Sequence, residues 1–140
     1  MAREDIAALI PHQGAMCLWE EVIEWDQERI RLVSQGHRDP AHPLRHNGRL
    51  HAVHLCEYGA QAMAVHGGLI ARAAGEAVKP GMLVSLRGVE LHVGRIDDLP
   101  GALEVEAHCL IAEASGGQYA FVIRHAGVEL ARGRAGVIHR

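Results

Sequence analysis

Residues Leu50 to Ala64, with the sequence LHAVHLCEYGAQAMA, decide the fold because they predict a single, mostly buried helix. Small and apolar residues fill most of this segment, so a sheet can wrap closely around it. Glu57 and Gln61 lie four residues apart and therefore share one helical face. An unpaired buried carboxylate is strongly destabilising. Glu57 must therefore have either a structural partner or a chemical role.

The segments on either side of this helix predict strands and one shaped loop. Residues 3–9 predict a short helix stopped by Pro11, and residues 37–49 predict the loop. We expect the long helix to continue to about Ala73. The predicted strands comprise a hairpin before the helix and a run after it: Met16–Trp25, Arg29–Ser34, Met82–Val93, Leu103–Ala114, Gln118–His125 and Val128–Ile138.

This order of elements predicts one α+β domain over residues 1–140. An antiparallel sheet would curl around the single long helix, with Gly88 as a β-bulge. The other face and the sheet edge would still need cover. We therefore expect a homodimer or a higher homo-oligomer.

Composition excludes several classes of function. The 140 residues are 49% hydrophobic and 22% charged, with a net charge of -3. No basic patch suggests a nucleic-acid partner, and no apolar run is long enough for membrane insertion. The amino terminus carries no signal-peptide pattern. Three scattered cysteines predict reduced thiols in a cytoplasmic protein.

Three stretches together resemble the hotdog-fold 3-hydroxyacyl-(acyl carrier protein) dehydratases, in particular the aryl-polyene-type branch. They are LIPHQGAMCLWEEVIEWD near the start, HPLRHNGRLHAVHLCEYGAQAMAVHGG in the middle and LHVGRIDDLPGALEVEA later. The resemblance covers nearly the whole chain. Glu57 and Gln61 match the family's helix pattern, and His42 matches its loop histidine. Leu50-His51-Ala52 replaces a Pro-Gly at the helix start, and the gap from His42 to Glu57 is about one residue longer.

The resemblance implies how these residues would act on a 3-hydroxyacyl thioester carried by acyl carrier protein or coenzyme A. His42 would take the proton from C2, because its pKa lies near neutrality. Glu57 would protonate the C3 hydroxyl, held in place by Gln61. Backbone amides around Leu50 to Ala52 would bind the thioester oxygen. His42 and Glu57 would come from different subunits, and no cofactor is implied.

Other histidines leave alternatives open. His37 is the second candidate for the base, and His12 is expected to be a structural cap in a turn. His51, His54 and Glu57 are spaced three apart and could share a helical face as zinc ligands. They drift around the helix, however, and no His-Glu-x-x-His motif is present, so we expect no metal.

The fold alone does not fix the reaction. A hotdog acyl thioesterase would use Glu57 to activate a water. A non-catalytic subunit that supports another dehydratase is the third hypothesis, and the altered Leu50-His51-Ala52 segment favours it.

Overall fold

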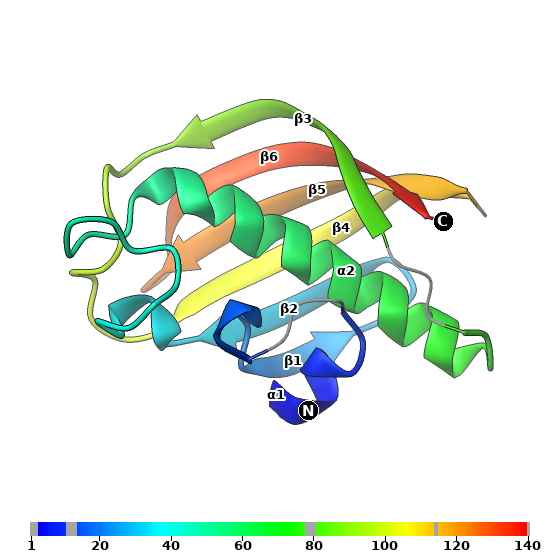
Figure 1. The fold of residues 1–140 in the computed structure, drawn as a ribbon. Helices are drawn as coiled ribbons and strands as arrows, with labels where there is room; N and C mark the ends of the chain where they lie inside the picture. Colours follow the sequence, from blue (N-terminus) through cyan, green and yellow to red (C-terminus); the bar gives the residue numbers. More distant parts are fainter. Residues whose placement is uncertain (1–2, 11–13, 78–80, 114, 140) are drawn as a thin grey trace.

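The protein is a curled sheet with one long helix packed against its concave face, as Figure 1 shows for the computed structural model. The structure describes residues 3–10, 14–77, 81–113 and 115–139. The expected α+β hotdog arrangement of a curled antiparallel sheet around a central helix is confirmed. In the described part of the chain, no helix is long and apolar enough to cross a membrane.

All strand pairs in the sheet are antiparallel, in the order β1-β2-β4-β5-β6-β3. The strands are β1 (Glu21–Trp25), β2 (Arg29–Ser34), β3 (Gly81–Leu91), β4 (Leu103–Glu113), β5 (Gly116–His125) and β6 (Val128–His139). The β1-β2 hairpin and the β4-β5-β6 meander follow the prediction. The sheet is not a simple run in chain order, because β3 crosses to the far edge and pairs with β6.

The central helix α2 (Leu55–Ala73) begins five residues later than the sequence predicts. Residues 50 and 51 lie outside the helix, because the segment 50–52 forms hydrogen bonds with residues 94–96 and His51 is extended. A short 3-10 helix, η3 (Ala52–His54), then leads into α2. Tertiary hydrogen bonds thus override the local helical preference of Leu50 to Val53.

The sheet lies very close to α2 at Gly59. A Cβ at this position would be 2.8 Å from Cδ2 of Phe121 on β5, which is shorter than a normal carbon contact. The indole nitrogen of Trp19 donates to the carbonyl oxygen of Tyr58 at 2.7 Å. These contacts fix the rotation of α2 against the sheet, and with it the direction of the Glu57 face.

Several local predictions hold and one does not. The amino-terminal helix is α1 (Arg3–Ala7), and the bulge at Gly88 is present with φ 58° and a shifted register. The first strand is shorter than predicted, because Gly14–Met16 form the 3-10 helix η1 and residues 17–20 are not paired as a strand. Pro11 and His12 lie outside the described residues, so the predicted turn and cap are not described.

The three cysteines form no disulfide among the described residues, and the Cys17 thiol donates to the Trp19 carbonyl at 3.8 Å. Cys17 is buried, whereas Cys56 and Cys109 are partly exposed. The core itself is built from aliphatic residues of α2 and the concave face of the sheet, around the buried rings of Trp19, Tyr58 and Phe121.

Candidate active site

Gln61 is the connecting side chain of the site. It is fully buried on α2, and its Oε1 accepts a hydrogen bond from the Leu18 amide at 2.9 Å. Its Nε2 donates to the Met16 carbonyl at 2.7 Å and to Oε1 of Glu57 at 3.2 Å. Gln61 therefore links the segment before β1 to the helix and contacts the Glu57 carboxylate from the next turn.

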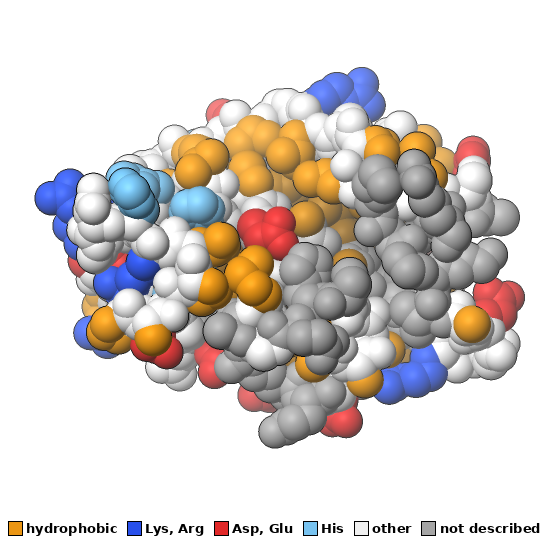
Figure 2. Space-filling model, viewed as in Figure 1, with side chains coloured by type: hydrophobic (Ala, Val, Ile, Leu, Met, Phe, Trp, Pro, Cys, Tyr) orange, Lys and Arg blue, Asp and Glu red, His pale blue; other side chains and the backbone are white. Residues whose placement is uncertain are grey.

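Glu57 is partly buried in the isolated chain, although most of its helix neighbours are buried. On the face that carries α2, Figure 2 shows acidic surface bordered by hydrophobic side chains, with histidine side chains further along. If another subunit covered this face, water would be removed from around Glu57. Removal of water strengthens the electrostatic interactions of a carboxyl group.

His42 is held from both sides in the loop that precedes α2. It is 8% exposed, its Nδ1 accepts the Leu44 amide at 3.1 Å, and its Nε2 lies 3.0 Å from the Tyr58 hydroxyl. An imidazole nitrogen that accepts an N–H carries no hydrogen itself. The neutral ring therefore has its hydrogen on Nε2 and donates it to Tyr58. Burial lowers the pKa of His42, which keeps the ring neutral at pH 7.

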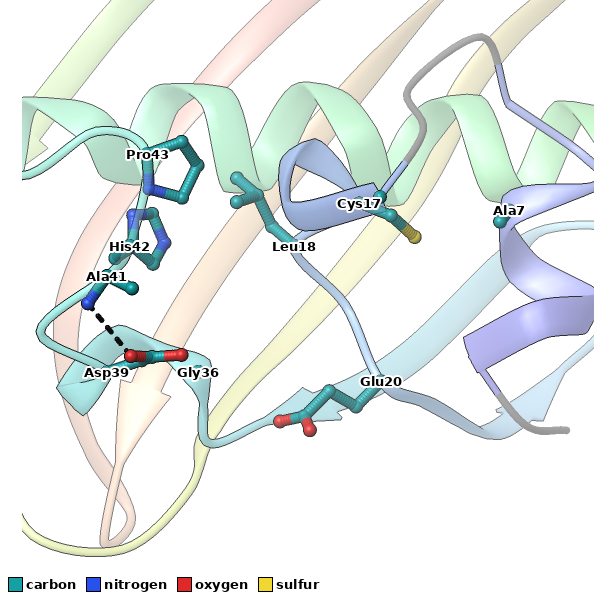
Figure 3. Close-up of a pocket in the computed structure, with 10 residues that line it drawn as sticks. Ala7, Cys17, Leu18, Glu20, Gly36, Asp39, Ala41, His42 and Pro43 are labelled. Carbon is teal, nitrogen blue, oxygen red and sulfur yellow. Dashed lines mark hydrogen bonds between the residues drawn. The ribbon is translucent and has the colours of Figure 1, made fainter.

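A cleft of about 410 Å³ lies beside His42, between the amino-terminal segment and the loop. Figure 3 shows His42 and Pro43 at one end of it, Leu18 next to them and Ala7 at the other end. The carboxylates of Glu20 and Asp39 also line it, and each accepts a backbone amide, from Gln35 and Ala41 respectively.

Within one chain, the partner of the His42 ring is Tyr58 rather than Glu57. Tyr58 is fully buried, its ring lies 6.1 Å from the His42 ring, and burial raises the pKa of its phenol. Its position next to Glu57 gave no signal of the contact, because residues adjacent in a helix point in different directions.

Two of the three backbone amides in the Leu50-Ala52 segment, which were expected to bind the thioester oxygen, already donate hydrogen bonds within the chain. The Leu50 amide donates to Oδ1 of Asp97 at 2.8 Å, and the Ala52 amide donates to the Gly94 carbonyl at 3.0 Å. The side chain of His51 is exposed, and its own amide has no acceptor among the described residues.

The remaining histidines do not assemble a second site. His37 is fully buried, and its Nε2 lies 2.9 Å from the Leu99 carbonyl oxygen, while burial lowers its pKa. His51 precedes the helix, so it does not share a helical face with His54 and Glu57. No group of three His, Cys, Asp or Glu side chains that could hold a metal ion occurs within the described ranges.

Comparisons with known proteins identify the family and the fold of this chain. The sequence model of the ApeP-like family, described as ApeP dehydratase, matches residues 4–140. A solved structure of the dehydratase heterocomplex ApeI:P from Xenorhabdus doucetiae matches with a TM-score of 0.88 and 25% identity, over 96% of this chain and 90% of that chain. No curated protein matches significantly.

More distant structures share the fold alone. AziG from S. sahachiroi matches with a TM-score of 0.62 and 18% identity, over 85% of this chain and 89% of that chain. A hypothetical thioesterase from Streptococcus pneumoniae, solved with coenzyme A, matches with a TM-score of 0.62 and 11% identity, over 86% of this chain and 84% of that chain.

Proposed function

Because the chain belongs to the ApeP-like dehydratase family, its function is that of an aryl-polyene-type dehydratase, and we propose that it removes water from 3-hydroxyacyl thioesters. The observation that carries the proposal is the hydrogen bond from Gln61 to Glu57 on α2. The same chain also presents a buried loop histidine, His42, beside a cleft. An oriented carboxyl group and a histidine are the pair that this elimination needs.

In the proposed reaction, His42 accepts the proton that leaves C2. Electrons of that C–H bond form the double bond to C3, and the C3 hydroxyl leaves as water with a proton from Glu57. Gln61 keeps the Glu57 carboxyl directed at the substrate. The thioester oxygen gains negative charge in the transition state, so an N–H donor beside it lowers the barrier.

The resting state of His42 adds a requirement to this mechanism. While the Leu44 amide occupies Nδ1, the hydrogen of the ring is on Nε2. To accept a proton at Nε2, the ring must carry its hydrogen on Nδ1 and give up the contact with Leu44. We propose that substrate or subunit binding shifts this loop contact.

We propose that a second copy of the chain completes the site, with His42 of one subunit and Glu57 of the other facing one substrate. Support comes from β3, a sheet edge with unpaired backbone groups and exposed apolar side chains. These side chains are Leu83, Val84, Leu86, Val89 and Leu91, each at least 37% exposed. Edge strands of this kind are normally covered in native assemblies.

For the carrier, we propose acyl carrier protein or coenzyme A. Arg87 on β3 lies opposite Arg134 on β6, and Arg132 precedes Arg134 on β6. Arg132 contacts Glu129, whereas Arg87 and Arg134 have no ion-pair partner within the described residues. Two unpaired arginines side by side repel each other and favour an acidic partner.

The test is to incubate the purified chain with a 3-hydroxyacyl-carrier substrate and follow its mass. We expect loss of one water, which Glu57→Gln and His42→Ala both abolish while circular dichroism shows retained folding. Release of free acid would instead support the thioesterase. Absence of any reaction would support a non-catalytic subunit.

The subunit proposal needs its own measurement. Light scattering of the purified chain should give the mass of a dimer or a larger homo-oligomer. A monomer at micromolar concentration would contradict the shared site.

A further inference from the structure

The segment before α2 is fastened to the connection between β3 and β4 by three hydrogen bonds. The Leu50 amide donates to Asp97, the Ile96 amide donates to the Leu50 carbonyl at 2.9 Å, and the Ala52 amide donates to the Gly94 carbonyl. Residues more than 40 positions apart therefore run side by side as a short antiparallel ladder, with His51 opposite Arg95.

The pattern of this ladder determines where the His51 amide points. In an antiparallel ladder, residue pairs alternate between those that exchange hydrogen bonds and those that do not. His51 and Arg95 form a pair of the second kind, because the bonds come from the residues on either side of them. His51 is extended, with φ -72° and ψ 147°. Its N–H is thus directed away from residues 94–96.

Asp97 is the side chain that fixes this arrangement. It is 8% exposed, and its Oδ1 accepts both the Leu50 amide and Nε of Arg95, the latter at 3.1 Å. A second guanidinium nitrogen of Arg95 binds Oδ2, so the pair is bidentate. The Arg95 guanidinium holds the pKa of Asp97 well below its usual range, so the carboxylate stays charged throughout the working pH range. Without the hydrogen bond to Asp97, the backbone at Leu50 and His51 would be less restricted in its orientation.

We infer that Asp97 is a positioning residue for the dehydration: through the Leu50 amide it aims the His51 N–H, which binds the thioester oxygen of the substrate. This inference rests on the proposed function and narrows it. Of the three residues in the Leu50-Ala52 segment, two have their amides engaged within the chain. The third is held in a fixed direction by a buried carboxylate, and a preorganised donor is the kind that stabilises a developing oxyanion.

The test uses Asp97→Ala and Asp97→Asn in the full-length protein, with Asp98→Ala as the matched control. Asp98 follows Asp97 directly, and its side chain is more exposed than that of Asp97. Its carboxylate lies 3.9 Å from Arg95, so it interacts with the same guanidinium but accepts no hydrogen bond from Leu50. We expect Asp97→Ala to lower kcat by about 100-fold with KM nearly unchanged, the loss typical of one oxyanion donor. Asp97→Asn keeps an acceptor for the Leu50 amide and should fall in between, and Asp98→Ala should match the wild type.

A spectroscopic readout separates positioning from general loss of structure. A butyryl thioester of pantetheine, labelled with ¹³C at the carbonyl, has no 3-hydroxyl group and cannot be dehydrated. Bound to the wild type, its infrared carbonyl band should move to lower wavenumber, and Asp97→Ala should lose this shift while still binding the probe.

The outcomes distinguish this inference from the proposed function. Wild-type dehydration, with kcat and the carbonyl shift both retained in Asp97→Ala, would overturn the inference and leave the function standing. A carbonyl shift that depends on Asp97 in a protein without dehydratase activity would support the inference and remove the function. If the wild type gives no carbonyl shift, His51 does not contact the oxygen and the inference is wrong.

Discussion

Replacing Gln61 by leucine tests the central connection of the site. The change keeps the volume and removes the amide, so the buried Leu18 amide and the Met16 carbonyl lose their partner. A buried group left unsatisfied costs about 1–3 kcal/mol. Leu18 is only 5% exposed and should bear the full cost, whereas Met16 is partly exposed and can bind water. We therefore expect Gln61→Leu to lower the free energy of unfolding by about 2–4 kcal/mol.

Urea unfolding followed by circular dichroism measures this loss, and an unchanged slope with denaturant shows that the variant still unfolds in the same way. A domain of ordinary stability, about 5–15 kcal/mol, remains folded after such a loss. Gln118→Leu is the control, because Gln118 is exposed on β5 and its replacement should change stability by less than about 0.5 kcal/mol. If Gln61→Leu lowers the free energy of unfolding by less than about 0.5 kcal/mol, the reasoning is refuted, because a buried polar group without a hydrogen bond destabilises the folded state by more than that.

Three further predictions concern pH, packing and the imidazole. Burial lowers the pKa of His66 in the folded state, so the unfolded chain binds a proton at this imidazole more readily as the pH falls below about 6.5. Urea titrations should therefore give a lower free energy of unfolding at pH 5.5 than at pH 7.5, and this difference should be smaller in His66→Gln. An equal difference in the wild type and the variant would contradict the prediction. Gly59→Ala should lower the free energy of unfolding by about 1–3 kcal/mol through overpacking, because the new Cβ would lie 2.8 Å from the Phe121 ring. Adding Phe121→Leu to this variant should recover part of the lost stability in thermal unfolding. A Gly59→Ala variant that is more stable than the wild type would disprove the steric argument. Nitrogen NMR of the resting chain should show His42 with its hydrogen on Nε2, as the Leu44 amide requires; a hydrogen on Nδ1 would show that this amide contact is absent in solution.

The sequence predicted the elements well where periodicity was strong. Alternation predicted β4 and β5 to within about two residues at each end, and the Glu57–Gln61 spacing predicted a contact that the structure contains. Both signals are local, because side chains two apart in a strand or four apart in a helix are neighbours whatever the rest of the chain does.

Features that depend on distant partners were beyond this reasoning. The predicted start of the long helix at Leu50 was wrong, because residues 50–52 form hydrogen bonds with residues 94–97. Nothing within the helix segment encodes that pairing. The same holds for the contact of His42 with Tyr58 and for the place of β3 beside β6. Each requires the order of strands in space, which one sequence pattern does not supply.

The position of β3 also determines the order in which the sheet can form. β4, β5 and β6 follow one another closely in the sequence, and each pairs with its immediate neighbour in the chain. In contrast, β3 reaches its partner β6 only after about 40 intervening residues have been placed. Closing long loops is entropically costly, so nucleation should occur in the meander and β3 should attach late. Substitutions on β3 would then accelerate unfolding while leaving the refolding rate nearly unchanged. The edge strand that we propose as the contact with another subunit would also be the first to detach from its own sheet.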